Sequence, residues 1–152
     1  NNDGVVVGFL LPAAADGTTF FKAFVWTKES GTKMLDQIPG DVRSQGLGIN
    51  EDGTIVGVSR SAAAVRRAVI WQNPDAQIQN LNDISAAGSP YLLIAGDVNA
   101  GGEIAGYTGG GLAFLATPDG SATAGKSNAS QTTQRELPAT VRRFLMRWGI
   151  TD

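Results

Sequence analysis

Short apolar runs bounded by Asn, Asp or Gly fill most of the first 117 residues. The run at 54–60 is rich in β-branched side chains and follows an Asp-Gly pair at 52–53, and a second run follows at 66–72. Short apolar runs between such turn residues are typical of antiparallel strands joined by hairpins. The pattern predicts a mainly β structure, with strands near 46–50, 54–60, 66–72 and 77–81.

One pattern recurs along the chain at constant spacing. Asn, Gly and Gly occur with the same offsets, 49 residues apart each time, at Asn1/Gly4/Gly8, Asn50/Gly53/Gly57 and Asn99/Gly102/Gly106. A second element follows each copy, at 23–26, 68–71 and 113–116. A period of 40–50 residues with four short strands is typical of β-propeller blades.

The repeat predicts an all-β fold of tandem four-stranded antiparallel units, about three propeller-like and incomplete blades. The copies span about 1–45, 46–90 and 91–126, together a β-repeat domain at 1–126. A β-sandwich or a β-solenoid would also use short strands, but a sandwich does not explain the period and solenoid coils are usually shorter.

The recurring residues are predicted to have structural roles. Asn50 and Asn99 would hold the hairpin entry through side-chain bonds to their own backbone, and Gly53 and Gly102 would supply the turn. Gly57 and Gly106 fall within strands, where a glycine indicates close approach of another backbone segment. Trp26 and Trp71 end equivalent strands and are expected to cover the seam between successive repeats.

The sequence Ile-Asn-x-x-Gly-x-Val-Val-Gly, then Ala-Phe-x-Trp, then a Leu-Asp stretch, resembles the HAF repeat, a bacterial extracellular repeat family. The resemblance covers residues 1–117, as two good copies and one degenerate copy. Lys22, Arg67 and Leu112 stand where the family has the His of its His-Ala-Phe triplet. The resemblance implies a propeller-like, exported protein, extracellular or periplasmic.

Three repeats are fewer than the 4–8 blades of a typical propeller, and the first copy begins inside a blade. We therefore expect a part of a larger protein, an assembly with other copies, or an open stack capped by the C-terminal segment. The first blade would then expose an unpaired strand edge, which is a site for strand addition by a partner.

The last residues predict a different element. Residues 127–136 have the polar composition of a linker, and 137–149 form an amphipathic helix with Pro138 at its start and Gly149 at its end. This helix caps the repeat domain, docks on a partner or lies on a membrane surface. Its candidate partner-binding residues are Phe144, Leu145, Trp148, Arg142, Arg143 and Arg147.

Composition excludes several function classes. The chain has no Cys and no His, so disulfides, Cys/His zinc sites and His-based triads are ruled out. A net charge of −2 does not suit a nucleic-acid-binding face, and no apolar run is long enough to span a membrane.

Two motifs and four carboxylates offer weak alternatives. The 120–127 string fits G-x-x-x-x-G-K-[ST], the phosphate-binding P-loop, but no apolar helix follows Lys126. Residues 30–33 fit S-x-x-K, which we interpret as an exposed turn because Gly31 disfavours the required helix. Carboxylates predicted near strand ends could pair for hydrolysis, namely Asp36, Asp83, Asp97 and Glu103.

The sequence thus favours a non-enzymatic extracellular scaffold or interaction module, without catalytic residues, metal or cofactor. It would bind a protein partner, or assemble with itself, through the open blade edge and the C-terminal helix. The alternatives are a ligand-binding or hydrolytic propeller that uses carboxylates and, less favoured, a nucleotide-binding protein.

Overall fold

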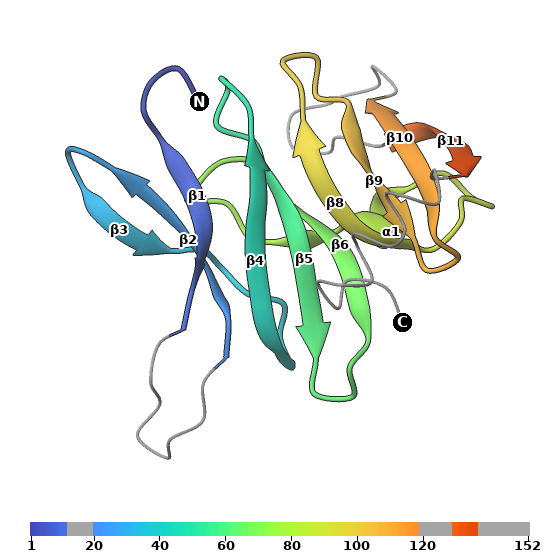
Figure 1. The fold of residues 1–152 in the computed structure, drawn as a ribbon, viewed down its shortest axis with the longest axis horizontal. Coiled ribbons are helices and arrows are strands. Elements are labelled where there is room, and N and C mark those ends of the chain that lie inside the picture. The colour runs from blue at the N-terminus through green and yellow to red at the C-terminus, as the bar shows by residue number, and fades with distance from the viewer. Residues whose placement is uncertain (12–19, 119–128, 137–152) are drawn as a thin grey trace.

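The computed structural model describes residues 1–11, 20–118 and the backbone of 129–136. Three antiparallel sheets follow one another along the chain, and Figure 1 shows them side by side from left to right.

The first sheet contains β1 (Val6–Leu10), β2 (Lys22–Thr27) and β3 (Gly31–Met34). The second contains β4 (Asp41–Ile49), β5 (Ile55–Ser61), β6 (Arg66–Trp71) and β7 (Gln79–Asn80), followed by the short helix α1 (Leu81–Ile84). The third contains β8 (Leu92–Val98), β9 (Ile104–Thr108), β10 (Leu112–Pro118) and β11 (Ala129–Glu136). The predicted all-β, antiparallel class is confirmed.

The three sheets share one strand register. Gly8 pairs with Phe24 in the first sheet, Gly57 with Val69 in the second and Gly106 with Phe114 in the third. The β4–β5 and β8–β9 pairs also share a register irregularity, between Gly46 and Gly48 and between Ala95 and Asp97. The repeat found in the sequence is therefore a repeat of strand pairing.

Each sheet has two faces, because neighbouring residues on a strand point to opposite sides. We call the face that carries the recurring strand glycine (Gly8, Gly57 or Gly106) the leading face, and the opposite face the trailing face. The leading faces of the three sheets carry Val6/Gly8/Phe24/Trp26, Ile55/Gly57/Val69/Trp71 and Ile104/Gly106/Phe114/Ala116. The trailing faces carry Val7/Ala23/Val25, Val56/Ala68/Ile70 and Ala105/Ala113/Leu115.

The core forms where a leading face meets the trailing face of the preceding sheet. One buried cluster joins Ile55, Val69 and Trp71 of the second sheet to Ala23 and Val25 of the first. The other joins Ile104, Phe114 and Ala116 of the third sheet to Val56, Ala68 and Ile70 of the second. The same two surfaces are thus used twice, in the same order along the chain.

The first strand of each later sheet packs across its predecessor. β4 contacts β1 and β2, and β8 contacts β5 and β6 in the same way. The first sheet has the order β1-β2-β3, so among the described residues β1 pairs with β2 alone. In the second sheet, β4 pairs with the edge of β5 that faces away from β6. The corresponding edge of β1 has no paired strand in the described part of the chain.

Several predicted boundaries are wrong. The linker predicted at 127–136 contains β11, which pairs with β10 over Ala129–Glu136. Its polar composition did not indicate a strand, but a strand added by main-chain hydrogen bonds at a sheet edge does not need an apolar sequence. The predicted repeat boundary near 45 also falls inside β4, which starts at Asp41.

The strand predicted at 77–81 is short and gives way to a helix. β7 has two residues, and α1 begins after Asn80, whose side chain accepts a hydrogen bond from Asn82 N–H at 3.1 Å. This cap satisfies one of the free N–H groups of the first turn. The residues that fit S-x-x-K form no helix, because Ser30 lies in a turn and β3 begins at Gly31.

The predicted C-terminal helix at 137–149 lies outside the described residues, as do its candidate partner-binding residues. The P-loop-like string at 120–127 lies outside them as well. In the described ranges, no helix is long and apolar enough to cross a membrane.

Candidate functional site

Asn1, Asn50 and Asn99 build the same turn ahead of β1, β5 and β9. In each turn the Asn side-chain oxygen accepts a hydrogen bond from the main-chain N–H four residues later, at 3.0, 2.9 and 2.9 Å. The glycine three residues later donates its N–H to the Asn carbonyl oxygen, at 3.1, 3.2 and 3.0 Å. These glycines have φ values of +75°, +82° and +76°, a region that residues with a Cβ rarely adopt. The turn roles predicted from the spacing are those observed.

The same three asparagines also join the repeats to one another. The Asn1 amide Nδ2 donates to the Asn50 carbonyl oxygen at 3.2 Å, and the Asn50 Nδ2 donates to the Asn99 carbonyl oxygen at 3.1 Å. At the end of the series the Asn99 Nδ2 donates to Glu103 Oε2 at 2.7 Å. We call this series the asparagine ladder. It runs through the turns at the upper end of the sheets in Figure 1.

Replacing Asn50 with alanine is expected to lower the free energy of unfolding by about 2 kcal/mol, because it removes two hydrogen bonds and leaves the partly buried Thr54 N–H without its acceptor. Asn50 itself is only 6 % exposed. Urea denaturation followed by circular dichroism measures the change.

Asn99→Ala is the matched control, because Asn99 is exposed and its amide bonds a side chain within its own turn. We expect a loss of about 1 kcal/mol or less there. Equal losses at the two positions would contradict a role of the ladder in joining repeats.

Gly57 and Gly106 lie where the first strand of their sheet bulges. A Cβ built on Gly57 would lie 1.9 Å from the carbonyl oxygen of Gln45, and one on Gly106 would lie 2.0 Å from that of Ile94. The predicted close approach of a backbone is therefore present, and it comes from the paired strand itself. At Gly8 the nearest atoms belong instead to the Phe24 ring, at 2.9 Å.

The two tryptophans differ although they hold equivalent positions. Trp71 is fully buried, and its indole Nε1 donates to the carbonyl oxygen of Asp36 in the preceding repeat at 2.9 Å. It covers the seam between the first and second sheets, as predicted. Trp26 is 38 % exposed on the leading face of the first sheet, so it covers no seam between described residues.

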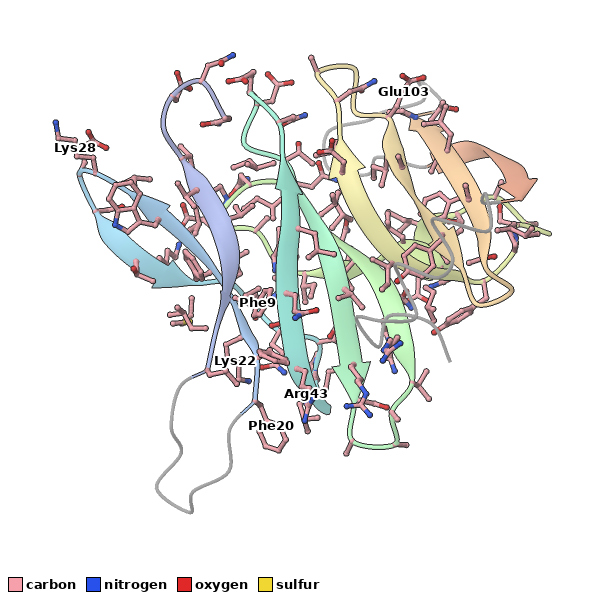
Figure 2. The ribbon with its side chains drawn as sticks, in the orientation of Figure 1. Phe9, Phe20, Lys22, Lys28, Arg43 and Glu103 are labelled. Carbon is pink, nitrogen blue, oxygen red and sulfur yellow. The ribbon has the colours of Figure 1, made fainter. Side chains whose placement is uncertain are left out.

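Aromatic and basic side chains gather at the opposite end of the first two sheets. The Arg43 guanidinium carbon lies 5.7 Å from the Phe20 ring centre and 5.6 Å from that of Phe21. Phe9 packs edge-on against Phe21, with ring centres 4.9 Å apart. Figure 2 shows Phe20 and Arg43 near the lower ends of the strands, with Phe9 above them. These contacts tie the residues just before β2 to the start of β4.

A buried charge pair was not predicted from the sequence. The Asp41 side chain is 2 % exposed, lies 3.5 Å from Arg67 Nη2 and accepts a hydrogen bond from the Ser59 hydroxyl. Arg67 also lines a cavity of about 360 Å³ with Gln79, Asp83 and four apolar residues, Ile38, Pro39, Ile78 and Ile84. Arg67 Nε and Gln79 Oε1 are buried without hydrogen-bond partners in the described structure.

The four carboxylates considered for catalysis accept hydrogen bonds, Asp36 from the next repeat and the other three from within their own segments. Asp36 Oδ2 accepts from Ile78 N–H, and Asp83 Oδ1 accepts from the Asn80 amide. Asp97 Oδ1 accepts from Val98 N–H, and Glu103 accepts from the Asn99 amide. Within the described ranges, no three acidic side chains come together as a metal site would require.

Tyr107 is buried beside Leu93 and Ile94. Burial raises the pKa of its phenol well above the ordinary value, and the charge of Arg66 acts in the opposite direction. The phenol therefore stays protonated at neutral pH and offers no general base.

Comparisons with known proteins identify no relative: no family model, no curated protein and no solved structure matches this chain. The HAF-repeat assignment remains a prediction from the sequence.

Proposed function

We propose that the chain is a non-enzymatic β-repeat scaffold, extracellular or periplasmic, that acts as an interaction module within a larger protein or assembly. The observation that carries the proposal is the recurrence of one turn and one strand register in all three sheets, together with one packed interface that is used twice. Residues at recurring positions are used to hold the repeats together, which is what a scaffold requires.

The finer architecture belongs to this proposal as well. We infer that the three sheets are propeller-like blades of the HAF-repeat type. Support comes from the four-strand order of the second and third sheets and from the way in which each sheet packs on the one before. The contact of β4 with β8 puts the first strands of neighbouring sheets together, as the inner strands of a propeller are.

A hydrolytic propeller and a nucleotide-binding protein are the alternatives from the sequence. The carboxylates that hydrolysis would use already accept hydrogen bonds that hold the structure together, Asp36 between two repeats and Asp83 and Asp97 within their own segments, which favours the scaffold. The nucleotide hypothesis depends on residues 120–127, which lie outside the described residues.

The edge of β1 is the proposed contact site of the scaffold. Strand addition uses main-chain hydrogen bonds for affinity and side-chain fit for specificity. In the second and third sheets this edge is covered by strands that end in Gly-Ile-Asn or Asp-Val-Asn and place a small residue, Gly46 or Ala95, opposite the strand glycine. The partner segment is therefore expected to be extended, with Gly or Ala opposite Gly8.

A peptide with the sequence of residues 41–50 tests this proposal. We expect it to bind the whole chain, measured by calorimetry, and we expect Gly8→Ala to weaken binding at least about tenfold. The reason is that the equivalent glycine in the second sheet leaves no room for a Cβ beside the added strand.

Two controls make the result specific. Thr32→Ala changes an exposed residue on β3, at the opposite edge of the same sheet, and should leave binding unchanged. A variant of this peptide with proline at alternate positions should not bind, because it lacks the main-chain donors at those positions. Equal binding by both peptides, or none by the native sequence, would refute strand addition at β1.

A further inference from the structure

Two sheet faces at opposite ends of the molecule have no partner among the described residues. The leading face of the second sheet packs on the first sheet, and the leading face of the third packs on the second. This order leaves the leading face of the first sheet and the trailing face of the third. The two surfaces that remain are the two halves of the interface that the molecule already uses twice.

The leading face of the first sheet is apolar and exposed. Val6 is 48 % and Trp26 38 % exposed, whereas the equivalent Ile55 and Trp71 are fully buried by the preceding sheet. Met34 lies opposite Phe24 on the same face and is also exposed. Contiguous apolar side chains of this kind mark interaction sites.

The trailing face of the third sheet has the chemistry that this surface fits. Leu115 is 40 % exposed, and Ala105 opposite it is exposed as well. The equivalent pairs, Val25 with Val7 and Ile70 with Val56, are the surfaces on which Trp71 and Phe114 pack in the interior. A pair of aliphatic residues thus recurs at the receiving position.

The asparagine ladder has two complementary ends. Asn50 donates to the carbonyl oxygen of the next Asn of the series. Asn99 donates to Glu103 within its own turn, and the described residues contain no later turn of the series. In a stack continued by another molecule, the equivalent acceptor for Asn99 is the carbonyl oxygen of Asn1. The ladder therefore indicates the same head-to-tail order as the sheet faces, from independent contacts.

We propose that the chain associates with a second copy of itself, with the leading face of the first sheet of one copy docked on the trailing face of the third sheet of the other. Such a heterologous contact closes into a ring or grows into an open stack. Two copies provide six sheets, and a closed propeller typically has 4–8 blades, so a closed dimer is expected. The closure rests on the propeller-like blades of the proposed function, whereas the pairing of faces does not.

The test uses one exposed substitution on each face. Sedimentation velocity of the whole chain over a range of concentrations should show a species of twice 15.8 kDa. Trp26→Glu, on the leading face, and Leu115→Lys, on the trailing face, should each give monomers, because every contact needs one face of each kind. Val65→Lys, an exposed position outside both faces, should leave the dimer intact.

Mixing the two monomeric variants gives the decisive result. Trp26→Glu keeps its trailing face and Leu115→Lys keeps its leading face, so an equimolar mixture should regain a one-to-one dimer through one intact contact. Asn99→Ala should weaken each contact between the unmodified faces about threefold to tenfold, through loss of one hydrogen bond per contact.

A native chain that stays monomeric at every concentration, or variants that remain monomeric when mixed, would overturn the proposal. Circular dichroism of each variant shows whether it has kept its fold, and Trp26→Gln and Leu115→Gln are the replacements if it has not. Larger assemblies with the same mutational pattern would support the pairing of faces and overturn closure into a dimer. None of these results depends on peptide binding at the β1 edge, so the two proposals fail separately.

Discussion

Replacing Gly57 with alanine is expected to lower the free energy of unfolding by at least about 3 kcal/mol, or to prevent folding. The added methyl group would lie 1.9 Å from the carbonyl oxygen of Gln45 and 3.0 Å from its carbonyl carbon. These are main-chain atoms of a paired strand in the middle of the molecule, so they cannot move aside without breaking the pairing of β4 with β5. Denaturant titration of the purified variant measures the loss.

Gly96→Ala is the matched control for Gly57→Ala. Gly96 also lies in a strand beside the recurring bulge, but a Cβ there would meet its nearest neighbour, the Ala105 carbonyl oxygen, at 3.7 Å, an ordinary contact. Its stability should stay within about 0.5 kcal/mol of the native chain or rise slightly, since alanine has less entropy than glycine in the unfolded state. If both variants were equally stable, the close approach at Gly57 would not have the energetic importance given to it here.

Replacing Trp71 with alanine is expected to cost about 3–5 kcal/mol, because the largest fully buried side chain would be lost together with its hydrogen bond. Trp71 fills the contact between the first and second sheets, beside Ile55 and Val69. The carbonyl oxygen of Asp36 would lose its indole donor as well. The loss is measured by urea denaturation, with circular dichroism as the probe.

The repeat itself provides the control for this prediction. Trp26 has the same position in the first sheet but is 38 % exposed, so Trp26→Ala should cost much less, about 1 kcal/mol. Both losses of unfolding free energy are measured below the concentration at which the chain associates. Their difference then gives the contribution of burying one tryptophan between two sheets. Equal losses would mean that Trp26 is also covered in solution.

The recurring residues could be predicted from the sequence because each of them meets a local need. Asn50 and Gly53 form a turn within four residues, and Gly57 stands out within a strand of β-branched residues. These interactions join residues that are close together in the sequence, so the sequence pattern reveals them. The strands around these residues, and the all-β class, followed from it.

Elements that depend on distant partners were missed or misplaced. β11 is polar and is a strand through its pairing with β10. α1 is four residues long and follows an Asn cap that also fits a strand end. In both segments the main-chain hydrogen bonds determine the secondary structure, and the pattern of apolar and polar side chains carries little information about them.

The contacts between repeats could not be read from one sequence. The ladder needs Asn1, Asn50 and Asn99 to stand at one end of adjacent sheets, which is a property of packing. Likewise Asp41 and Arg67 are 26 positions apart, and nothing local marks them as partners. The 49-residue period nevertheless identified the three asparagines of the ladder.

The ladder also fixes the length of one turn in each sheet. Each turn that carries a ladder asparagine must keep its length, because an inserted residue would displace the asparagine from its neighbour. At the opposite end of the sheets the strands are joined by connections of unequal length, at 11–21, 62–65 and 109–111. Changes in sequence and length can therefore accumulate in these connections while the register of the sheets is preserved.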